Sequence, residues 1–209
     1  MFDEQLRQFK DRALLPAARR IGTRVHPNTV TLIGGVVGLA AGLAGFQGAY
    51  AVGLALWLAN RTLDGLDGAL ARVTGQQSAS GGYIDILTDF LVYAFVPLML
   101  ALGRSSEAVL VALALLLSAF YINAASWMYL AALLERSQAT GAAQTSVVMP
   151  TGLIEGAETV VFFALSFIFP AHLVLLFSVM AVLVMATVVQ RLLWALPRLR
   201  TIDSPRDKG

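Results

Sequence analysis

Four aspartates lie within two apolar stretches of this 209-residue chain, at spacings that could hold a metal ion. Asp64 and Asp67 are three residues apart, and Asp85 and Asp89 are four apart. In a helix, each of these pairs shares one face. A charged group inside a membrane costs from ~3 to more than ~10 kcal/mol, and four acids so close together would repel one another. The pattern therefore predicts that a bound cation neutralises them.

The chemistry expected of such a site is metal-assisted transfer of a phosphate group. Ligands that are all oxygen favour a hard cation such as Mg²⁺, Mn²⁺ or Ca²⁺. Two such ions about 4 Å apart can bind both the attacking and the leaving oxygen of a displacement. Arg61 and Arg72 would add positive charge for phosphate oxygens, and Gly68 and Ala71 would let a ligand approach the backbone.

Two other interpretations fit the same residues. The acids could form buried salt bridges with Arg61 and Arg72, but four acids against two bases leave two negative charges in excess. The acids could also form the binding site of a cation transporter or channel, since intramembrane acids mark ion pathways. The neighbouring glycines and the position near a helix end favour an enzyme with a phosphate-bearing ligand, and the residues alone leave the transporter open.

The composition predicts an all-α integral membrane protein. The chain is 57% hydrophobic and only 13% charged, with a mean hydropathy of +0.72, whereas soluble domains carry about 25% charged residues. There is no cysteine, which excludes disulfides and thiolate metal sites. We expect the lipid bilayer as a partner and no nucleic acid.

Six transmembrane helices should position the acids. Each apolar stretch is long enough to cross ~30 Å of hydrocarbon at 1.5 Å per residue. The expected spans are 29–48, 50–73, 82–103, 107–134, 152–169 and 172–196. They form a domain over 26–200, preceded by an amphipathic interfacial helix over 1–25 and followed by a flexible tail over 201–209.

Glycines should shape this bundle in two places. Small residues let helices pack closely, which we expect of the first span through Gly34, Gly35, Gly38 and Gly42. We expect Gly75, Gly81 and Gly82 to form a tight turn between the second and third spans.

The basic residues predict the orientation. With six spans, 14 of the 15 Lys and Arg residues lie on or toward one side, and only Arg104 lies opposite. The side richer in Lys and Arg faces the cytoplasm. The termini, the loops over 74–81 and 135–150, and the active site should therefore face the cytoplasm, in a cell membrane of bacterial or archaeal type.

The spacing of the acids resembles the signature of the CDP-alcohol phosphotransferase family. That signature reads Asp-x2-Asp-Gly-x2-Ala-Arg-x8-Gly-x3-Asp-x3-Asp, and the chain matches every fixed position from Asp64 to Asp89. The segment His26–Thr31 also resembles the start of that family's first span. Because the six-span layout agrees as well, the resemblance covers nearly the whole chain.

The resemblance implies a reaction of phospholipid biosynthesis. A CDP-linked donor, most often CDP-diacylglycerol, passes its phosphatidyl group to an alcohol and releases CMP. Asp64, Asp67 and Asp85 would hold two divalent cations, Mg²⁺ or Mn²⁺, and Asp89 would lie near the metals and act as general base. The CDP pocket would contain Gly68, Ala71, Arg72 and Gly81, with Arg61, Asn28 and Thr31 beside them. A homodimer is typical of the family, and a CDP-aminoalcohol phosphotransferase acting on diacylglycerol is the alternative within it.

The acceptor alcohol is expected to carry no phosphate. Family members that take inositol phosphate have several bases where the 135–150 loop has only Arg136, and an Arg-Pro pair where this chain has Gly156 and Ala157. Arg191 is the other candidate base. A phosphate in a partly dehydrated pocket needs two or more such partners. We therefore favour a zwitterionic or neutral alcohol, although Arg61 or a dimer partner could supply the missing charge.

Two acids and two polar residues complete the acceptor candidates. Glu155 and Glu158 should lie in the first turns of the fifth span, where they either favour the helix dipole or pair with a cationic acceptor. Asn123 and Ser126 in the fourth span could hydrogen-bond an acceptor or a neighbouring helix.

Overall fold

The computed structural model describes residues 14–139, 152–154 and 156–203, and these residues form helices with no strand. The predicted all-α class is therefore confirmed. Residues 14–21 are helical and lead into a 3₁₀ turn, η1, at Gly22–Arg24. The other elements are α2 (Pro27–Phe46), α3 (Tyr50–Thr74), α4 (Ala79–Gly103), α5 (Glu107–Ala139), α6 (Gly156–Ile168), the 3₁₀ turn η2 (Pro170–His172) and α7 (Leu173–Asp203).

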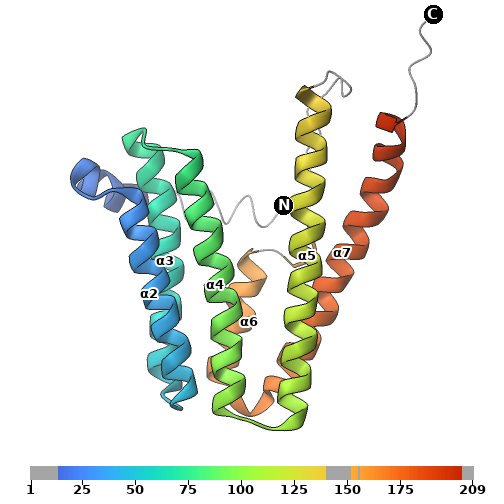
Figure 1. Cartoon of the computed structure of the whole chain (residues 1–209). Coiled ribbons are helices and arrows are strands. Elements are labelled where there is room, and N and C mark those ends of the chain that lie inside the picture. The colour runs from blue at the N-terminus through green and yellow to red at the C-terminus, as the bar shows by residue number, and fades with distance from the viewer. Residues whose placement is uncertain (1–13, 140–151, 155, 204–209) are drawn as a thin grey trace, which may run out of the picture.

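The helices form two halves. In the first, α2 packs against both α3 and α4, and in the second, α5 packs along α7. Helix α6 contacts α3 on one side and α7 on the other, so it joins the halves. Figure 1 shows that α5 and α7 diverge from α2–α4, and that the separation is greater at the end of the bundle where α3 meets α4.

Glycines bring α2 close to α4, as predicted. A Cβ atom added to Gly35 would lie 2.6 Å from Thr88, and one added to Gly38 would lie 2.7 Å from Val92. One turn further, a Cβ on Gly42 would lie 2.9 Å from Phe95. Real Cβ atoms do not approach neighbours this closely, so the α2–α4 contact depends on these residues having no side chain.

Within the described part of the chain, four helical segments are long and apolar enough to cross a membrane: Pro27–Phe46, Ala79–Gly103, Glu107–Arg136 and Pro170–Arg200. Six were expected. Helix α3 is 25 residues long but carries the site's charged residues, and α6 has only 13 residues. The sides of the bundle suit lipid, because large apolar residues such as Val36, Val182 and Leu193 are each 67% exposed.

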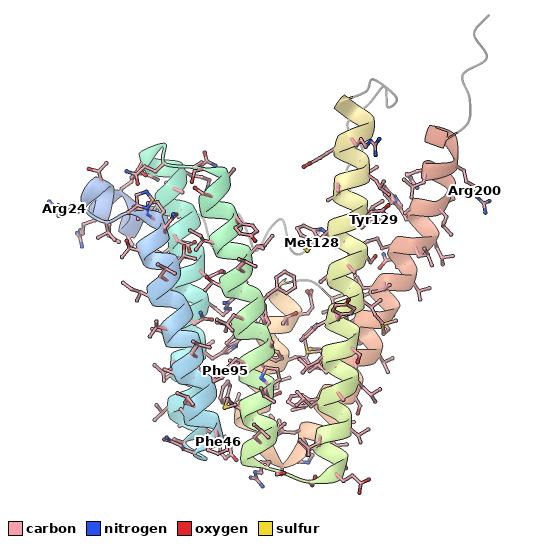
Figure 2. All side chains as sticks on the ribbon, viewed as in Figure 1. Arg24, Phe46, Phe95, Met128, Tyr129 and Arg200 are labelled. Carbon is pink, nitrogen blue, oxygen red and sulfur yellow. The ribbon has the colours of Figure 1, made fainter. Side chains whose placement is uncertain are left out.

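Two arginines lie toward one end of the bundle. Figure 2 shows Arg24 and Arg200 toward the end where α3 meets α4, and Phe46 toward the other end. The sequence assigned both arginines to the cytoplasmic side, and that orientation stays a prediction.

The turn between α3 and α4 is shorter than expected. Helix α3 ends with Gly75 in the left-handed conformation, at φ 67°. Helix α4 begins at Ala79, because the Ser78 hydroxyl accepts a hydrogen bond from the Gly81 N–H at 3.0 Å. Gly81 and Gly82 therefore lie in the first turn of α4, and the predicted loop over 74–81 was too long.

The fifth and sixth helices also differ from the predicted bounds. Helix α6 begins at Gly156 rather than 152, because the Ile154 N–H donates to the Thr187 hydroxyl of α7 at 3.0 Å instead of entering a helix. Helix α7 continues to Asp203, past the predicted start of the tail at 201.

The amphipathic segment predicted over 1–25 is only partly described. Its first 13 residues lie outside the described part of the chain. In the described part, Ala18 is buried against Val30 of α2 and against Ala69 and Leu70 of α3.

Candidate active site

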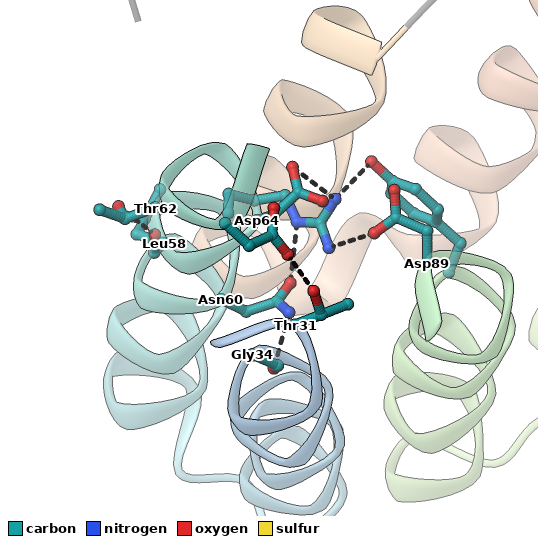
Figure 3. A network of polar contacts seen from close by, with 10 residues as sticks. Thr31, Gly34, Leu58, Asn60, Thr62, Asp64 and Asp89 are labelled. Atoms are coloured by element: carbon teal, nitrogen blue, oxygen red, sulfur yellow. Dashed lines mark hydrogen bonds and ion pairs between the residues drawn. The ribbon is translucent and has the colours of Figure 1, made fainter. Parts of the chain in front are cut away.

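The acids of α3 and α4 meet at one buried arginine. Arg61 is 7% exposed, and its Nη2 donates to Oδ1 of Asp89 at 2.9 Å. Its Nη1 lies 3.8 Å from Oδ2 of Asp64 (Figure 3). Asp64 and Asp89 each lie ten residues from the helix end at the α3–α4 turn, which is about 15 Å along the axis. The predicted common level of the two acid pairs is therefore present.

Other contacts fix the Arg61 side chain inside the protein. Its Nε donates to the Asn60 carbonyl oxygen at 2.8 Å, and its Nη1 donates to the Tyr93 hydroxyl at 2.9 Å. The guanidinium carbon lies 5.0 Å from the Trp57 ring centroid and 4.9 Å from that of Tyr93, within cation–π range. These hydrogen bonds go to protein groups, and the contact of Arg61 with phosphate stays a prediction. The salt-bridge interpretation thus describes Arg61, which pairs with two of the four acids.

Thr31 fixes the third acid. Its hydroxyl donates to Oδ2 of Asp67 at 2.6 Å and lies 3.2 Å from the Pro27 carbonyl. Thr31 is 7% exposed and Asp67 is 5% exposed. Thr31 was predicted beside the CDP pocket, and in the structure it orients a predicted metal ligand. Asn60 adds a second link between α2 and α3, since its Nδ2 donates to the Gly34 carbonyl at 2.8 Å (Figure 3).

The donor set fits a hard divalent cation. Its oxygens come from two facing helices at one level, and the charges of Asp67, Asp85 and Asp89 interact with one another. Among the described residues, no three acidic or histidine side chains are gathered closely enough to count as a metal cluster. Two of the four carboxylates, those of Asp64 and Asp89, instead lie on either side of the Arg61 guanidinium.

The residues predicted for the CDP pocket lie between the acids and the α3–α4 turn. Gly68, Ala71 and Arg72 occupy the last turns of α3, and a Cβ on Gly68 would lie 3.3 Å from Nη1 of the exposed Arg72. A Cβ on Gly81 would lie 3.0 Å from Oδ1 of Asn28. Asn28 from α2 and Gly81 from α4 are thus neighbours, whereas the resemblance gave only their separate positions.

The candidate acceptor residues lie in the other half. Arg191 is 9% exposed, and its Nη1 lies 2.9 Å from Oδ1 and 3.3 Å from the carbonyl of Asn123, and 3.4 Å from the Ser126 hydroxyl. Arg136 is exposed near the end of α5. Glu158 lies in the first turn of α6, and Glu155 lies outside the described residues.

A protein-family comparison decides the class. The model for CDP-alcohol phosphatidyltransferase matches residues 24–197, which include all of α2 to α6 and most of α7. The chain belongs to the CDP-alcohol phosphatidyltransferase family. It is therefore an enzyme of phospholipid biosynthesis, and its apolar helices are those of a membrane protein.

One relative covers most of this phosphatidyltransferase, and another covers a smaller part. It is 39% identical over 149 residues to the inner membrane protein YnjF of Escherichia coli, covering 70% of this chain and 71% of that protein. It is also 39% identical over 80 residues to the archaetidylinositol phosphate synthase of Pyrococcus horikoshii, covering 38% of this chain and 42% of that protein.

A solved structure shares the fold. The Mycobacterium tuberculosis phosphatidylinositol phosphate synthase PgsA1, with CDP-DAG bound, superposes with a TM-score of 0.68 at 22% identity, covering 95% of this chain and 98% of that one. A second structure of PgsA1, with manganese and citrate, gives 0.67 at 23% identity, covering 94% and 92%.

Sequence reasoning missed three residues around the phosphatidyltransferase site: Trp57, Asn60 and Tyr93. A spacing signal was present for all three. Trp57 precedes Arg61 by four residues, and Tyr93 follows Asp89 by four, so each shares a helix face with a site residue. Asn60 precedes Asp64 by four residues, so the same rule applies to it.

Proposed function

We propose that this enzyme transfers a phosphatidyl group from CDP-diacylglycerol, or a closely related CDP-linked donor, to the hydroxyl of a small alcohol and releases CMP. The observation that carries this proposal is the convergence of Asp64 and Asp89 on one guanidinium, on helices that match the family over their whole length. A lipid donor is consistent with the CDP-DAG bound in the PgsA1 structure.

Asp64, Asp67 and Asp85 would hold Mg²⁺ or Mn²⁺, two ions per site, with Asp89 near them. When bound, such ions offset the charge of the diphosphate and of the departing CMP. Manganese in a second PgsA1 structure is consistent with this metal class. Thr31 would hold Asp67 in place for the metals, since its hydroxyl donates to Oδ2 of that carboxylate.

Asp89 would act as the general base. Its Oδ1 accepts from Arg61, which leaves Oδ2 to take the proton of the acceptor hydroxyl. As that proton leaves, the acceptor oxygen forms a bond to the phosphatidyl phosphorus and the bond from phosphorus to the CMP oxygen breaks. Gly68, Ala71, Arg72 and Gly81, with Asn28, would line the CDP side.

We further propose the membrane arrangement that this chemistry needs. All six helices from α2 to α7 would cross the bilayer, with α3 and the short α6 sheltered by the four apolar segments. The α3–α4 turn would face the cytoplasm, where CDP-linked donors and soluble alcohols meet. The interfacial helix over 1–25 and a homodimer belong to the same proposal.

The acceptor we propose carries no phosphate. The Arg191 guanidinium contacts Ser126 of α5. Arg136 lies ten residues after Ser126 on α5, which is about 15 Å along the helix axis. That separation favours two independent bases over a clamp on one phosphate. Glu158, and Glu155 outside the described residues, could pair with an amine of the acceptor.

Two similar proteins favour inositol phosphate as the competing acceptor. One is an archaetidylinositol phosphate synthase and the other a phosphatidylinositol phosphate synthase. Inositol phosphate therefore belongs in the test beside the acceptors that carry no phosphate.

CMP release from purified protein tests the reaction. The assay contains Mg²⁺ or Mn²⁺, CDP-diacylglycerol and one alcohol at a time: serine, choline, inositol, glycerol phosphate or inositol phosphate. We expect CMP with at least one alcohol that carries no phosphate. Productive use of a phosphorylated alcohol, lost in Arg191→Ala, would overturn the acceptor proposal. CMP release from CDP-choline with diacylglycerol alone would indicate the CDP-aminoalcohol reaction, and selective cation flux without any CMP would indicate a transporter.

A further inference from the structure

Arg61 has no task of its own in the proposed transfer step, although the sequence placed it beside the CDP pocket. It lies three residues before the signature begins, so it is not one of the signature's fixed positions. Its guanidinium is nevertheless buried and paired with Asp64 and Asp89, two of the four acids of the proposed site. A charge placed there without function would be costly, because desolvating a guanidinium requires compensation from several partners.

The contacts of Arg61 allow one orientation. A guanidinium has five N–H donors in a rigid plane. Asn60 takes the Nε donor, Tyr93 takes Nη1, and Asp89 takes Nη2. The rings of Trp57 and Tyr93 pack on the same group at 5.0 and 4.9 Å. A lysine could replace the charge but could not make these three hydrogen bonds at once.

The rings extend this support into the other half. Trp57 and Tyr93 contact Phe163 of α6, with ring centroids 5.3 and 5.9 Å apart. The Trp57 indole N–H donates to the Val160 carbonyl at 3.1 Å. The packing around Arg61 is therefore braced by α3, α4 and α6.

We propose that Arg61 is a positioning residue of this enzyme, which holds Asp89 by one carboxylate oxygen and whose positive charge weakens divalent-cation binding at the neighbouring acids. The first part rests on the proposed function, because it makes Asp89 the base that Arg61 aims. The second part depends on charge alone. The four carboxylates carry a charge of −4, and the Arg61 guanidinium reduces this net negative charge to −3. A cation bound there must share Asp64 and Asp89 with Arg61.

Two substitutions separate charge from geometry. Arg61→Gln removes the charge. Arg61→Lys keeps the charge but loses the planar set of N–H donors. The measurements use the full chain in detergent: Mn²⁺ affinity without donor, from the electron paramagnetic resonance signal of free Mn²⁺, and the kcat and KM of CMP release.

Arg104→Gln is the matched control. Arg104 also donates to a tyrosine hydroxyl, that of Tyr50 at 3.0 Å, and lies 5.6 Å from its ring centroid. It lies at the opposite end of α4 and far from the acids, so we expect it to change neither Mn²⁺ affinity nor kcat.

We expect Arg61→Gln to bind Mn²⁺ roughly ten-fold more tightly than the unmodified protein, because a repelling charge is gone. In Arg61→Lys we expect Mn²⁺ affinity within about two-fold of the unmodified protein, and a kcat lower by roughly 10- to 100-fold with the donor KM little changed. A residue that only stabilises the fold would lower the unfolding temperature without tightening Mn²⁺ binding.

Several results would overturn the proposal. Unchanged or weaker Mn²⁺ binding in Arg61→Gln removes the charge effect, and a normal kcat in Arg61→Lys removes the positioning effect. If Arg61→Gln does not fold, Arg61→Lys decides through the kcat–KM split. If the unmodified protein binds Mn²⁺ but releases no CMP with any acceptor, the proposed function fails, and the Mn²⁺ comparison still decides the charge effect. If it binds no Mn²⁺, both proposals fail.

Discussion

The two halves of the bundle each bury an arginine, and they hold it differently. Arg61 in the α2–α4 half is paired with Asp64 and Asp89. Arg191 in the α5–α7 half donates to the neutral oxygens of Asn123 and Ser126. Arg61 thus lies between two acids of the predicted metal site, whereas Arg191 links α7 to α5 through Asn123 and Ser126.

The two halves also differ in how their helices pack. Helices α2 and α4 approach so closely across glycines that an added Cβ would clash. The α5–α7 half joins the first through the short α6 and through side chains such as Trp57. On the proposed function, the reacting groups belong to the α2–α4 half and acceptor choice belongs to the other. The predictions below test this division, beginning with the largest effect.

Asp89→Asn should nearly abolish turnover. We expect kcat to fall by about 10²–10⁴-fold, because loss of a general base removes transition-state stabilisation, while the KM for CDP-diacylglycerol changes little. Asp64→Asn should instead weaken Mn²⁺ binding and activity together. Glu107→Gln, at the exposed start of α5, is the control and should behave normally. Near-normal turnover in Asp89→Asn would show that another group is the base.

The sequence predicted the acid site because helix geometry is local. Spacings of three and four residues place Asp64 with Asp67 and Asp85 with Asp89 whatever surrounds them, and a short connection makes the two helices antiparallel. The partners of the acids could not be predicted in the same way. Thr31 is 36 residues from Asp67, and Arg61 is 28 from Asp89, so both contacts depend on how three helices pack.

Helix ends were the weakest part of the fold prediction, for a related reason. Helix α4 starts earlier than predicted because the Ser78 hydroxyl caps its N-terminus. This cap is local, so a search of the sequence for serine N-caps could have found it. Helix α6 starts late because of Thr187, 33 residues away from Ile154. A tertiary hydrogen bond of that kind leaves no periodic signal in the sequence.

Thr31→Val should impair the metal site with little change in shape. It removes a hydrogen bond to a charged carboxylate, which contributes about 1.5–3 kcal/mol. We expect Mn²⁺ affinity and kcat/KM to fall by roughly 10- to 100-fold. Thr62→Val is the matched control, because Thr62 also bonds a carbonyl one turn back, that of Leu58 at 2.8 Å, but is exposed and touches no acid. Equal effects in the two variants would refute the role given to Thr31.

Gly38→Ala should destabilise the first half alone. The added Cβ would lie 2.7 Å from both methyl groups of Val92 and 3.0 Å from Nδ2 of Asn60, and overpacking of this kind costs about 1–3 kcal/mol. Gly156→Ala at the start of α6 is the counterpart, since a Cβ there meets nothing within 4 Å. We expect a lower thermal unfolding temperature in detergent for Gly38→Ala and no decrease for Gly156→Ala. A decrease in both would contradict the contrast in packing.

Thr187→Val should give the smallest effect and place it in the second half. The hydroxyl of Thr187 accepts from the Ile154 N–H at 3.0 Å and lies 3.1 Å from the Leu183 carbonyl. Valine keeps the shape and loses both bonds, at a cost of about 1 kcal/mol. Because the lost bond anchors the chain entering α6, we expect the acceptor KM to rise a few-fold while the donor KM and Mn²⁺ affinity stay unchanged. Thr74→Val, which loses only a bond to the Leu70 carbonyl, should leave all three constants unchanged. A rise in the donor KM equal to that in the acceptor KM would mean that the two halves do not divide the substrates.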